Sequence, residues 1–167
     1  MEPSELPFMD MLIRLSMATG FGLVLGLERE LRGKPAGLRS HMLVSIGAAG
    51  FVIVGMHILS TTSTGDPSAR VDPTRIVEGI IGGIGFLGAG CIIQARGSIQ
   101  GITTGASIWI AGALGVASGI GNLPLAGLLA AFALITITVL GYFEKRIIEG
   151  RVKGAGRNSG RNLNRVD

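Results

Sequence analysis

The sequence predicts an all-α membrane protein, a polytopic bundle of five transmembrane helices. Its 167 residues have a mean hydropathy of +0.54, which is very high for a chain of this length. Most of the 15 basic and 11 acidic residues lie in short gaps between long, largely uncharged stretches or in the C-terminal tail. A bilayer sorts charges in this way because ionised groups are costly in hydrocarbon. These observations exclude a soluble enzyme.

Five apolar segments approach the roughly 20 residues that a helix needs to cross a bilayer. The last two contain no charged residue, whereas the first contains Asp10 and Arg14 and the third contains Glu78, beyond Arg75 at its outer end. Those three charges need a partner or a place at the membrane surface. Together the segments form one predicted transmembrane domain, residues 1–143. The predicted spans are Phe8–Leu27, Ser40–Leu59, Thr74–Gln94, Ile102–Gly119 and Leu123–Phe143.

The distribution of Lys and Arg predicts the orientation of the helices. All of them except Arg14, Arg70 and Arg75 lie after the first, third or fifth span. Cytoplasmic segments carry the excess of basic residues, so we expect the N-terminus outside the cell and the C-terminus in the cytoplasm. Residues 60–73 then form an outer loop. We expect the basic tail, residues 144–167, to be disordered and either to contact anionic lipid or to serve only as a topology-setting flank.

An internal repeat relates the two halves of the predicted bundle. A shift of 64 residues aligns Arg32–Ser40 with Arg96–Thr104 through the pattern R-G-x-x-x-G-[L/I]-x-[S/T]. We infer two helical hairpins in the same orientation, related by a pseudo-twofold axis, with convergent turn chemistry as the alternative. The same shift aligns Arg14 with Glu78, which predicts that the two charges neutralise each other. Asp10, one helical turn before Arg14, is a competing partner, and a position at the headgroup level would leave all three in water.

Glycine accounts for 28 residues and recurs at the small-x-x-x-small spacing that lets helices approach closely. We expect most of these glycines to pack inside one bundle. One such face is also available for a homodimer, and a helix broken in mid-membrane is the remaining alternative. The pairs are Gly22 and Gly26, Gly79 and Gly83, Gly85 and Ala89, Gly101 and Gly105, and Gly115 and Gly119.

Two predicted helix N-termini lie on the cytoplasmic side. Ser40 is predicted to cap the second helix, and Thr103 or Thr104 to cap the fourth. The free amides of the second helix, together with Arg39, form a candidate anion site. Lipid phosphate, an acidic partner or the glutamates that end the first helix can fill it, and internal pairing with those glutamates is the preferred interpretation. The candidate functional residues at this end are Glu28, Arg29, Glu30, Arg39, Ser40, Thr103 and Thr104.

Metal and nucleic-acid chemistry are disfavoured. Glu28 and Glu30 diverge on a helix and have Arg29 and Arg39 close by, which makes a poor magnesium site. A single cysteine, Cys91, is interpreted as a packing residue deep in the third span, and two histidines make a metal centre improbable. We expect no cofactor and no catalytic set. With 5% aromatic residues, the basic segments indicate membrane topology and not nucleic-acid binding.

Four short motifs occur in a specific order along the chain. They are GLERE at Gly26–Glu30, KPAGLRSHMLV at Lys34–Val44, GIGFLGAG at Gly83–Gly90 and GITTGASIW at Gly101–Trp109. Together they resemble the MgtC/SapB family of bacterial inner-membrane proteins. The resemblance extends from about Asp10 to Phe143. Ser40 stands where the family usually has Thr, and Gly105 where Ala is common.

The resemblance implies a polytopic inner-membrane protein linked to magnesium limitation, acid stress and, in pathogens, survival inside host cells. It implies regulation of other membrane machinery, with the proton-driven ATP synthase as one partner. The best-described member has a cytoplasmic C-terminal domain of the ACT type, and we expect this chain to be the short form that lacks it.

The residues themselves leave two functions open. A transporter or channel requires polar or charged groups in mid-membrane, and the helix centres offer mainly Ser45, Ser107, Thr136 and Thr138. We therefore expect a non-enzymatic protein that acts through protein or lipid contacts, with magnesium- or proton-linked transport as the alternative.

Overall fold

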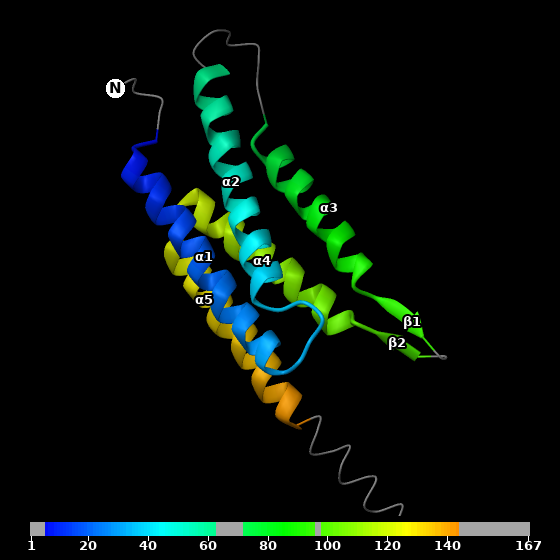
Figure 1. Cartoon of the computed structure of the whole chain (residues 1–167). Helices are drawn as coiled ribbons and strands as arrows, with labels where there is room; N and C mark the ends of the chain where they lie inside the picture. The colour runs from blue at the N-terminus through cyan, green and yellow to red at the C-terminus, as the bar shows by residue number, and fades with distance from the viewer. Residues whose placement is uncertain (1–5, 63–71, 96–97, 144–167) are drawn as a thin grey trace, which may run out of the picture. The chain divides into compact units, whose positions relative to one another are not determined.

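Five helices and one short hairpin make up the residues that the computed structural model describes, 6–62, 72–95 and 98–143 (Figure 1). Successive helices run in opposite directions, which confirms the predicted all-α bundle. The helices are α1 (Phe8–Leu31), α2 (Leu38–Thr62), α3 (Thr74–Gly90), α4 (Ile102–Ile120) and α5 (Leu123–Ile135), and the strands are β1 (Ile93–Ala95) and β2 (Ser98–Gln100).

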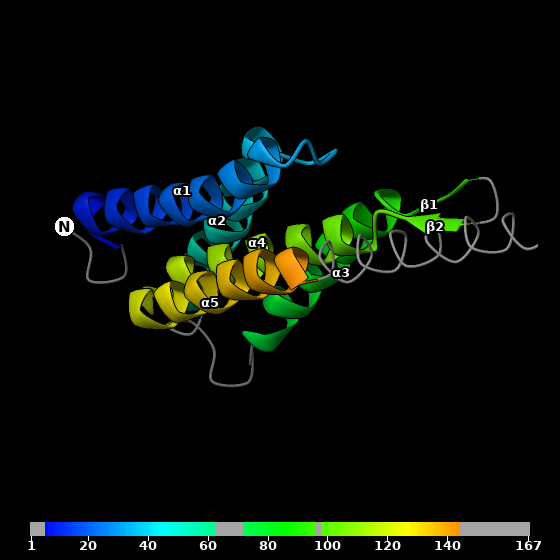
Figure 2. The same cartoon turned by 90° about the horizontal axis from the view of Figure 1, so that it is seen from below.

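The pair α2 and α4 forms the centre of the bundle, and α1 and α3 each pack against both helices. Seen from below, α2 and α4 lie between α1 and α3 (Figure 2). Two helical hairpins in the same orientation pack in this way, with α1 and α2 as one hairpin and α3 and α4 as the other. The arrangement therefore agrees with the hairpins that the internal repeat predicts.

Small residues allow these helices to touch main chain to main chain. A Cβ atom added to Gly22 of α1 would lie 2.8 Å from a carbonyl oxygen of α2, and one added to Gly115 of α4 would overlap the carbonyl oxygen of Ser45. Gly88 and Gly105 face each other where α3 meets α4, since a Cβ atom on Gly105 would lie 2.7 Å from the Gly88 carbonyl oxygen. Close packing inside the bundle is confirmed for these positions.

The third helix is shorter than the sequence predicts. The predicted span runs from Thr74 to Gln94, but α3 ends at Gly90, and Ile93–Ala95 then pairs antiparallel with Ser98–Gln100. Hydropathy does not distinguish a buried helix from a short apolar strand. The β-branched isoleucines that follow Gly90 favour extended backbone, and the glycine itself is a poor helix former.

The ends of α1 and α2 also differ from the predicted spans. α1 continues to Leu31, and α2 covers Leu38–Thr62, so residues 60–62 belong to the helix and not to the outer loop. Residues 63–71 of that loop and the tail, residues 144–167, lie outside the described residues.

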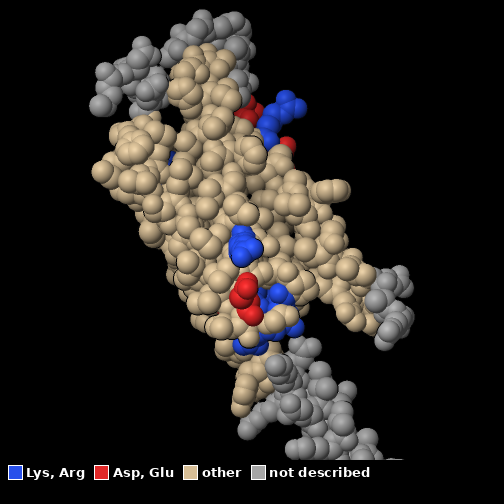
Figure 3. Space-filling view, viewed as in Figure 1, with Lys and Arg blue, Asp and Glu red and all other residues tan. Residues whose placement is uncertain are grey.

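Helix length and charge distribution both fit a bilayer. Within the described part of the chain, four helical segments are long and apolar enough to cross a membrane: α1, α2, α4 and residues 123–143. α3 has 17 residues and is therefore about 26 Å long, close to the roughly 30 Å of a hydrocarbon core. Most charged side chains on the face in Figure 3 lie in two groups with an uncharged expanse between them, as expected for a multi-pass membrane protein.

The chain divides into two compact units, residues 1–133 and 134–167. The described part of the first unit contains α1 to α4, the hairpin and most of α5. In the second unit, residues 134–143 are helical and include a π-helical turn at Thr136–Leu140. The predicted fifth span is therefore helical along its length, with one π turn.

Candidate functional site

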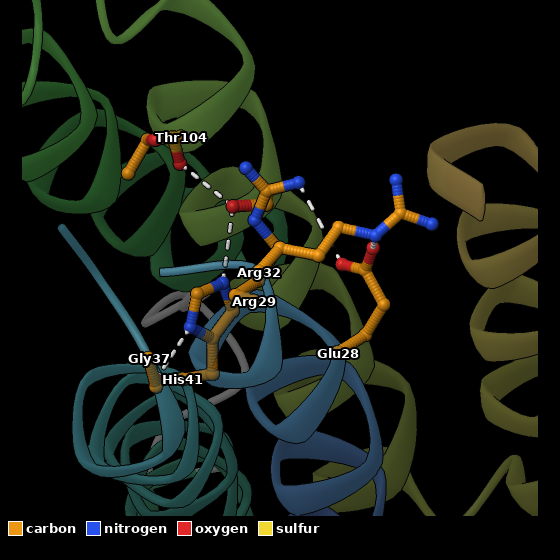
Figure 4. Close-up of polar contacts among 7 residues, drawn as sticks. Glu28, Arg29, Arg32, Gly37, His41 and Thr104 are labelled. Carbon is orange, nitrogen blue, oxygen red and sulfur yellow. Dashed lines mark hydrogen bonds and ion pairs between the residues drawn. The ribbon is translucent and has the colours of Figure 1, made fainter. Parts of the chain in front are cut away.

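Three helix ends meet at the end of the bundle that carries residues 32–37 and the β1–β2 hairpin, here called the linker end. The C-terminus of α1 and the N-termini of α2 and α4 bring together Glu28, Arg29, Arg32, His41 and Thr104 (Figure 4). The side chain of Arg29 is only 2% exposed and that of Glu28 is 13% exposed. Buried charges are costly unless they are paired, so this cluster is the strongest candidate for a functional site.

Two arginines share the carboxylate of Glu28. Oε1 forms an ion pair with Nε of Arg32, one helical turn later, and Oε2 lies 3.6 Å from Nη1 of Arg29. Neither contact has the geometry of a hydrogen bond. Nε and Nη2 of Arg29 are buried too and have no hydrogen-bond partner in the described part of the chain. Buried donors are normally satisfied, so one edge of the Arg29 guanidinium is incomplete.

The side chain of Glu30, near the end of α1, binds the N-terminus of α2. Its Oε2 accepts a 2.9 Å hydrogen bond from the amide of Leu38, the first residue of α2. The predicted internal pairing of this helix end is thus confirmed for Glu30. Ser40 is the third residue of α2, so its predicted role as the N-cap is wrong, because the Glu30 carboxylate lets the helix begin earlier. Arg39 is exposed and forms no ion pair with any described residue, and it does not complete the predicted anion site.

His41 is fully buried and links α2 to α4. Its Nδ1 lies 2.8 Å from the carbonyl oxygen of Gly37, and its Nε2 lies 3.0 Å from Oγ of Ser107. The hydroxyl of Ser107 also lies 2.8 Å from the carbonyl oxygen of Thr104. Sequence analysis gave His41 no role, although an ionisable side chain within an apolar span was the available signal.

Neither Thr103 nor Thr104 caps α4, so this prediction is also wrong. The helix begins at Ile102 after Gly101, whose φ of 89° is left-handed, and no side chain caps the first turn. Glycine adopts this conformation at little cost and directs the chain out of the β-hairpin into the helix. Thr104 is 3% exposed and takes part in the cluster through its carbonyl oxygen, whereas Thr103 is exposed.

At the opposite end of the bundle, Arg14 does not pair with Glu78 as predicted. Its Nη1 donates a 2.7 Å hydrogen bond to the carbonyl oxygen of Gly119, near the C-terminus of α4. Glu78 and Asp10 are exposed, and neither forms an ion pair within the described residues. A helix C-terminus has unpaired carbonyls and a partial negative charge. It can therefore bind the guanidinium of Arg14 as a carboxylate would.

Cys91 is the C-cap of α3 and does not lie deep in a span as predicted. It is a free, partly buried thiol whose Sγ lies 3.5 Å from the carbonyl oxygen of Leu87. Among the described residues, no three side chains of the His, Cys, Asp or Glu type come close enough together to hold a metal ion.

Known proteins resemble this chain along most of its length. The model of the MgtC family matches residues 15–146. YhiD of Escherichia coli K12, whose name proposes a magnesium transporter, is 37% identical over 140 residues, covering 81% of this chain and 61% of that protein. SapB of Bacillus subtilis is 35% identical over 148 residues, covering 86% and 62%. SrpB of Synechococcus elongatus is 38% identical over 133 residues, covering 75% and 71%.

No solved structure matches the chain. The chain spans about three fifths of the length of YhiD and SapB, at 61% and 62%. The family match nevertheless includes most of α1, all of α2 to α5 and the linker-end cluster. This chain is therefore a multi-pass membrane protein that belongs to the MgtC/SapB family.

Proposed function

We propose that this protein regulates or adapts membrane physiology through contacts with other membrane proteins or with lipids, without enzymatic activity. The conditions are those that the family resemblance implies: magnesium limitation, acid stress and survival inside host cells. In the proposed orientation the linker end faces the cytoplasm and the N-terminus lies outside the inner membrane. The basic residues at the linker end support this orientation, and they include Arg29, Arg32, Lys34 and Arg39.

The proposal rests on the glycines of α3 that no described residue contacts closely. A Cβ atom added to Gly79, Gly82, Gly83 or Gly85 would meet no atom within 4 Å, so packing within the described residues does not require glycine at these positions. Several glycines of α1 and α4, by contrast, touch neighbouring backbones. Glycine weakens a helix, and close approach by another helix is the usual compensation in a membrane. The face therefore fits a helix from another chain.

An apolar cavity of about 720 Å³ adjoins this face, between α2 and α3. Leu43, Gly47 and Phe51 line it from α2, and Gly79 and Gly83 line it from α3. Small residues on both walls allow a transmembrane helix of a partner to approach both backbones. The resemblance implies the proton-driven ATP synthase as a candidate partner, and a second copy of this chain is the alternative.

Photo-crosslinking in native membranes tests the proposal. One variant carries a photoreactive phenylalanine in place of Gly83, and the matched control carries it in place of Leu128, which is 58% exposed on α5. We expect a discrete crosslinked protein from position 83 and none from position 128. A subunit of ATP synthase or a second copy of this chain would identify the partner. Crosslinks to lipid alone at position 83 would contradict the protein contact.

A substitution at the same position tests whether the contact matters in cells. Gly83→Leu should leave the bundle folded, because the position is open, but should abolish the protein's contribution to growth at low magnesium. Gly115→Leu is the control for packing inside the bundle, and it should reduce the amount of folded protein because a side chain there would overlap the Ser45 carbonyl oxygen. A fully active Gly83→Leu protein would remove the basis of the proposal.

Magnesium- or proton-linked transport is the second candidate function. The name of YhiD favours it, and so do the buried polar side chains of His41, Ser45 and Ser107 within α2 and α4. Purified protein in liposomes distinguishes the two functions. Selective magnesium or proton flux that disappears on replacing His41, in a variant that still folds, would favour transport over regulation by contact.

A further inference from the structure

The N-termini of α2 and α4 both lie at the linker end, but among the described residues only the N-terminus of α2 has a negative partner. A helix N-terminus carries roughly half a positive charge on its unpaired amides. At α2 the carboxylate of Glu30 accepts a hydrogen bond from the first amide. At α4 no side chain caps the first turn. The internal repeat aligns Glu30, which precedes α2, with Gln94, which precedes α4. Gln94 is uncharged, so the repeat provides no equivalent anion for α4.

Arg29 adds a positive charge beside the N-terminus of α4. Its guanidinium points toward Thr104 in the first turn of α4 (Figure 4), and its side chain is 2% exposed. Nη1 faces Glu28, whereas Nε and Nη2 have no hydrogen-bond partner among the described residues. Nε and Nη2 form one edge of the guanidinium and donate in parallel. This edge is the one that binds two oxygens of a carboxylate or phosphate at once.

In the part of the chain that the structure describes, the nearby carboxylates do not satisfy this edge. Glu28 lies 3.6 Å from Nη1 of Arg29 and shares its charge with Arg32. Glu30 is already bound to the amide of Leu38. A buried cation next to a positive helix end is unfavourable unless an anion lies between them.

We propose that a phosphate group binds between the Nε and Nη2 edge of Arg29 and the N-terminal amides of α4. A tetrahedral oxyanion can offer two oxygens to the guanidinium and a further oxygen to the helix amides. The group comes either from inorganic phosphate or from the headgroup of an anionic phospholipid at the membrane surface. Both sources present the same chemistry to Arg29.

Binding to the purified protein in detergent tests the proposal. In one arm, inorganic phosphate is titrated by calorimetry, and thermal unfolding is compared in phosphate and in chloride at equal ionic strength. In the other arm, phosphatidylglycerol is added to the delipidated protein, and bound lipid is counted by native mass spectrometry. Saturable binding with a raised unfolding temperature in the first arm identifies free phosphate. The same result confined to the second arm identifies the lipid headgroup.

Two variants assign the binding to this position. Arg29→Lys keeps the charge but lacks the parallel donors, so it should weaken phosphate or lipid binding by about tenfold or more. Arg39→Ala removes an exposed arginine from the same end and should leave binding unchanged. Equal weakening by both variants would indicate nonspecific attraction and overturn the site. No saturable binding in either arm by the wild-type protein would also overturn it, whether or not Arg29→Lys folds, because water alone would then satisfy Arg29.

Discussion

Nε2 of His41 lies 3.0 Å from Oγ of Ser107, which joins α2 to α4 inside the bundle. The contacts continue to the carbonyl oxygens of Gly37 and Thr104, and neither carbonyl can donate a proton. Three contacts therefore require three protons, whereas a neutral imidazole and one hydroxyl supply two. Neutral His41 must donate from Nδ1 to the carbonyl oxygen of Gly37. The single hydroxyl proton of Ser107 is then shared between two acceptors, Nε2 of His41 and the carbonyl oxygen of Thr104.

Removing the hydroxyl of Ser107 should destabilise the bundle. Ser107→Ala leaves Nε2 of neutral His41 buried without a donor, at an expected cost of about 1–3 kcal/mol in the free energy of unfolding. Ser118→Ala is the matched control, because Ser118 is buried on the same helix but bonds only to the Leu114 carbonyl oxygen. Denaturant unfolding in detergent, followed by circular dichroism, measures both variants. Equal losses would show that the link between the helices adds nothing.

Arg14 should stabilise the bundle through the C-terminus of α4. Arg14→Gln removes the guanidinium that donates to the Gly119 carbonyl oxygen, and we expect a loss of about 1–2 kcal/mol. Glu78→Gln should leave stability unchanged, because Glu78 is exposed and unpaired in the described part of the chain. Thermal unfolding in the same detergent compares the two. Equal losses in the two single variants, with no further loss in the double variant, would instead support the ion pair between Arg14 and Glu78 that the repeat predicts.

Hydropathy and charge predict the number and order of the helices and their alternating directions, because a bilayer imposes length and charge placement on each one separately. The helix ends are not predictable in this way. α2 begins at Leu38 because a carboxylate eight positions earlier binds its first amide. α4 begins after Gly101 because the preceding residues form a hairpin. Both ends depend on contacts that local sequence patterns do not specify.

The candidate site was predictable in part for a similar reason. The sequence alone identifies three candidates as charged residues at the end of an apolar span: Glu28, Arg29 and Glu30. The contact between His41 and Ser107 joins residues 66 positions apart and depends on how α2 packs against α4. The internal repeat predicted the wrong partner for Arg14. It aligns side chains with side chains, whereas Arg14 binds a backbone carbonyl oxygen.

Neutralising Glu28 should destabilise the protein more than neutralising Glu30. Glu28→Gln leaves the buried guanidinium of Arg29 without its nearest anion, and breaking such a pair costs about 3 kcal/mol. Glu30→Gln should cost about 1 kcal/mol, because this residue is exposed and an amide oxygen can still accept from Leu38. Parallel denaturant titrations measure the difference. Both titrations use delipidated protein in phosphate-free buffer, where an equal or smaller loss for Glu28→Gln would show that Glu28 does not stabilise Arg29.

The start of α3 should weaken in acid because of Asp72. Oδ1 of Asp72 accepts a 2.7 Å hydrogen bond from the hydroxyl of Thr74 and a 2.9 Å hydrogen bond from its amide. These two bonds hold the pKa of the Asp72 carboxyl below its ordinary value. Because the pKa is lower in the folded state, the stabilisation is complete above the ordinary Asp pKa and is lost as the pH falls through the lowered one.

Hydrogen exchange at the first turn of α3 measures this loss, after correction for the intrinsic effect of pH on exchange. In the wild-type protein, protection should fall only at pH values below the ordinary Asp pKa. Asp72→Asn keeps an oxygen acceptor but cannot titrate in this range, so its protection should not change over the same interval. An identical acid-dependent loss in Asp72→Asn would assign the titration to a different group.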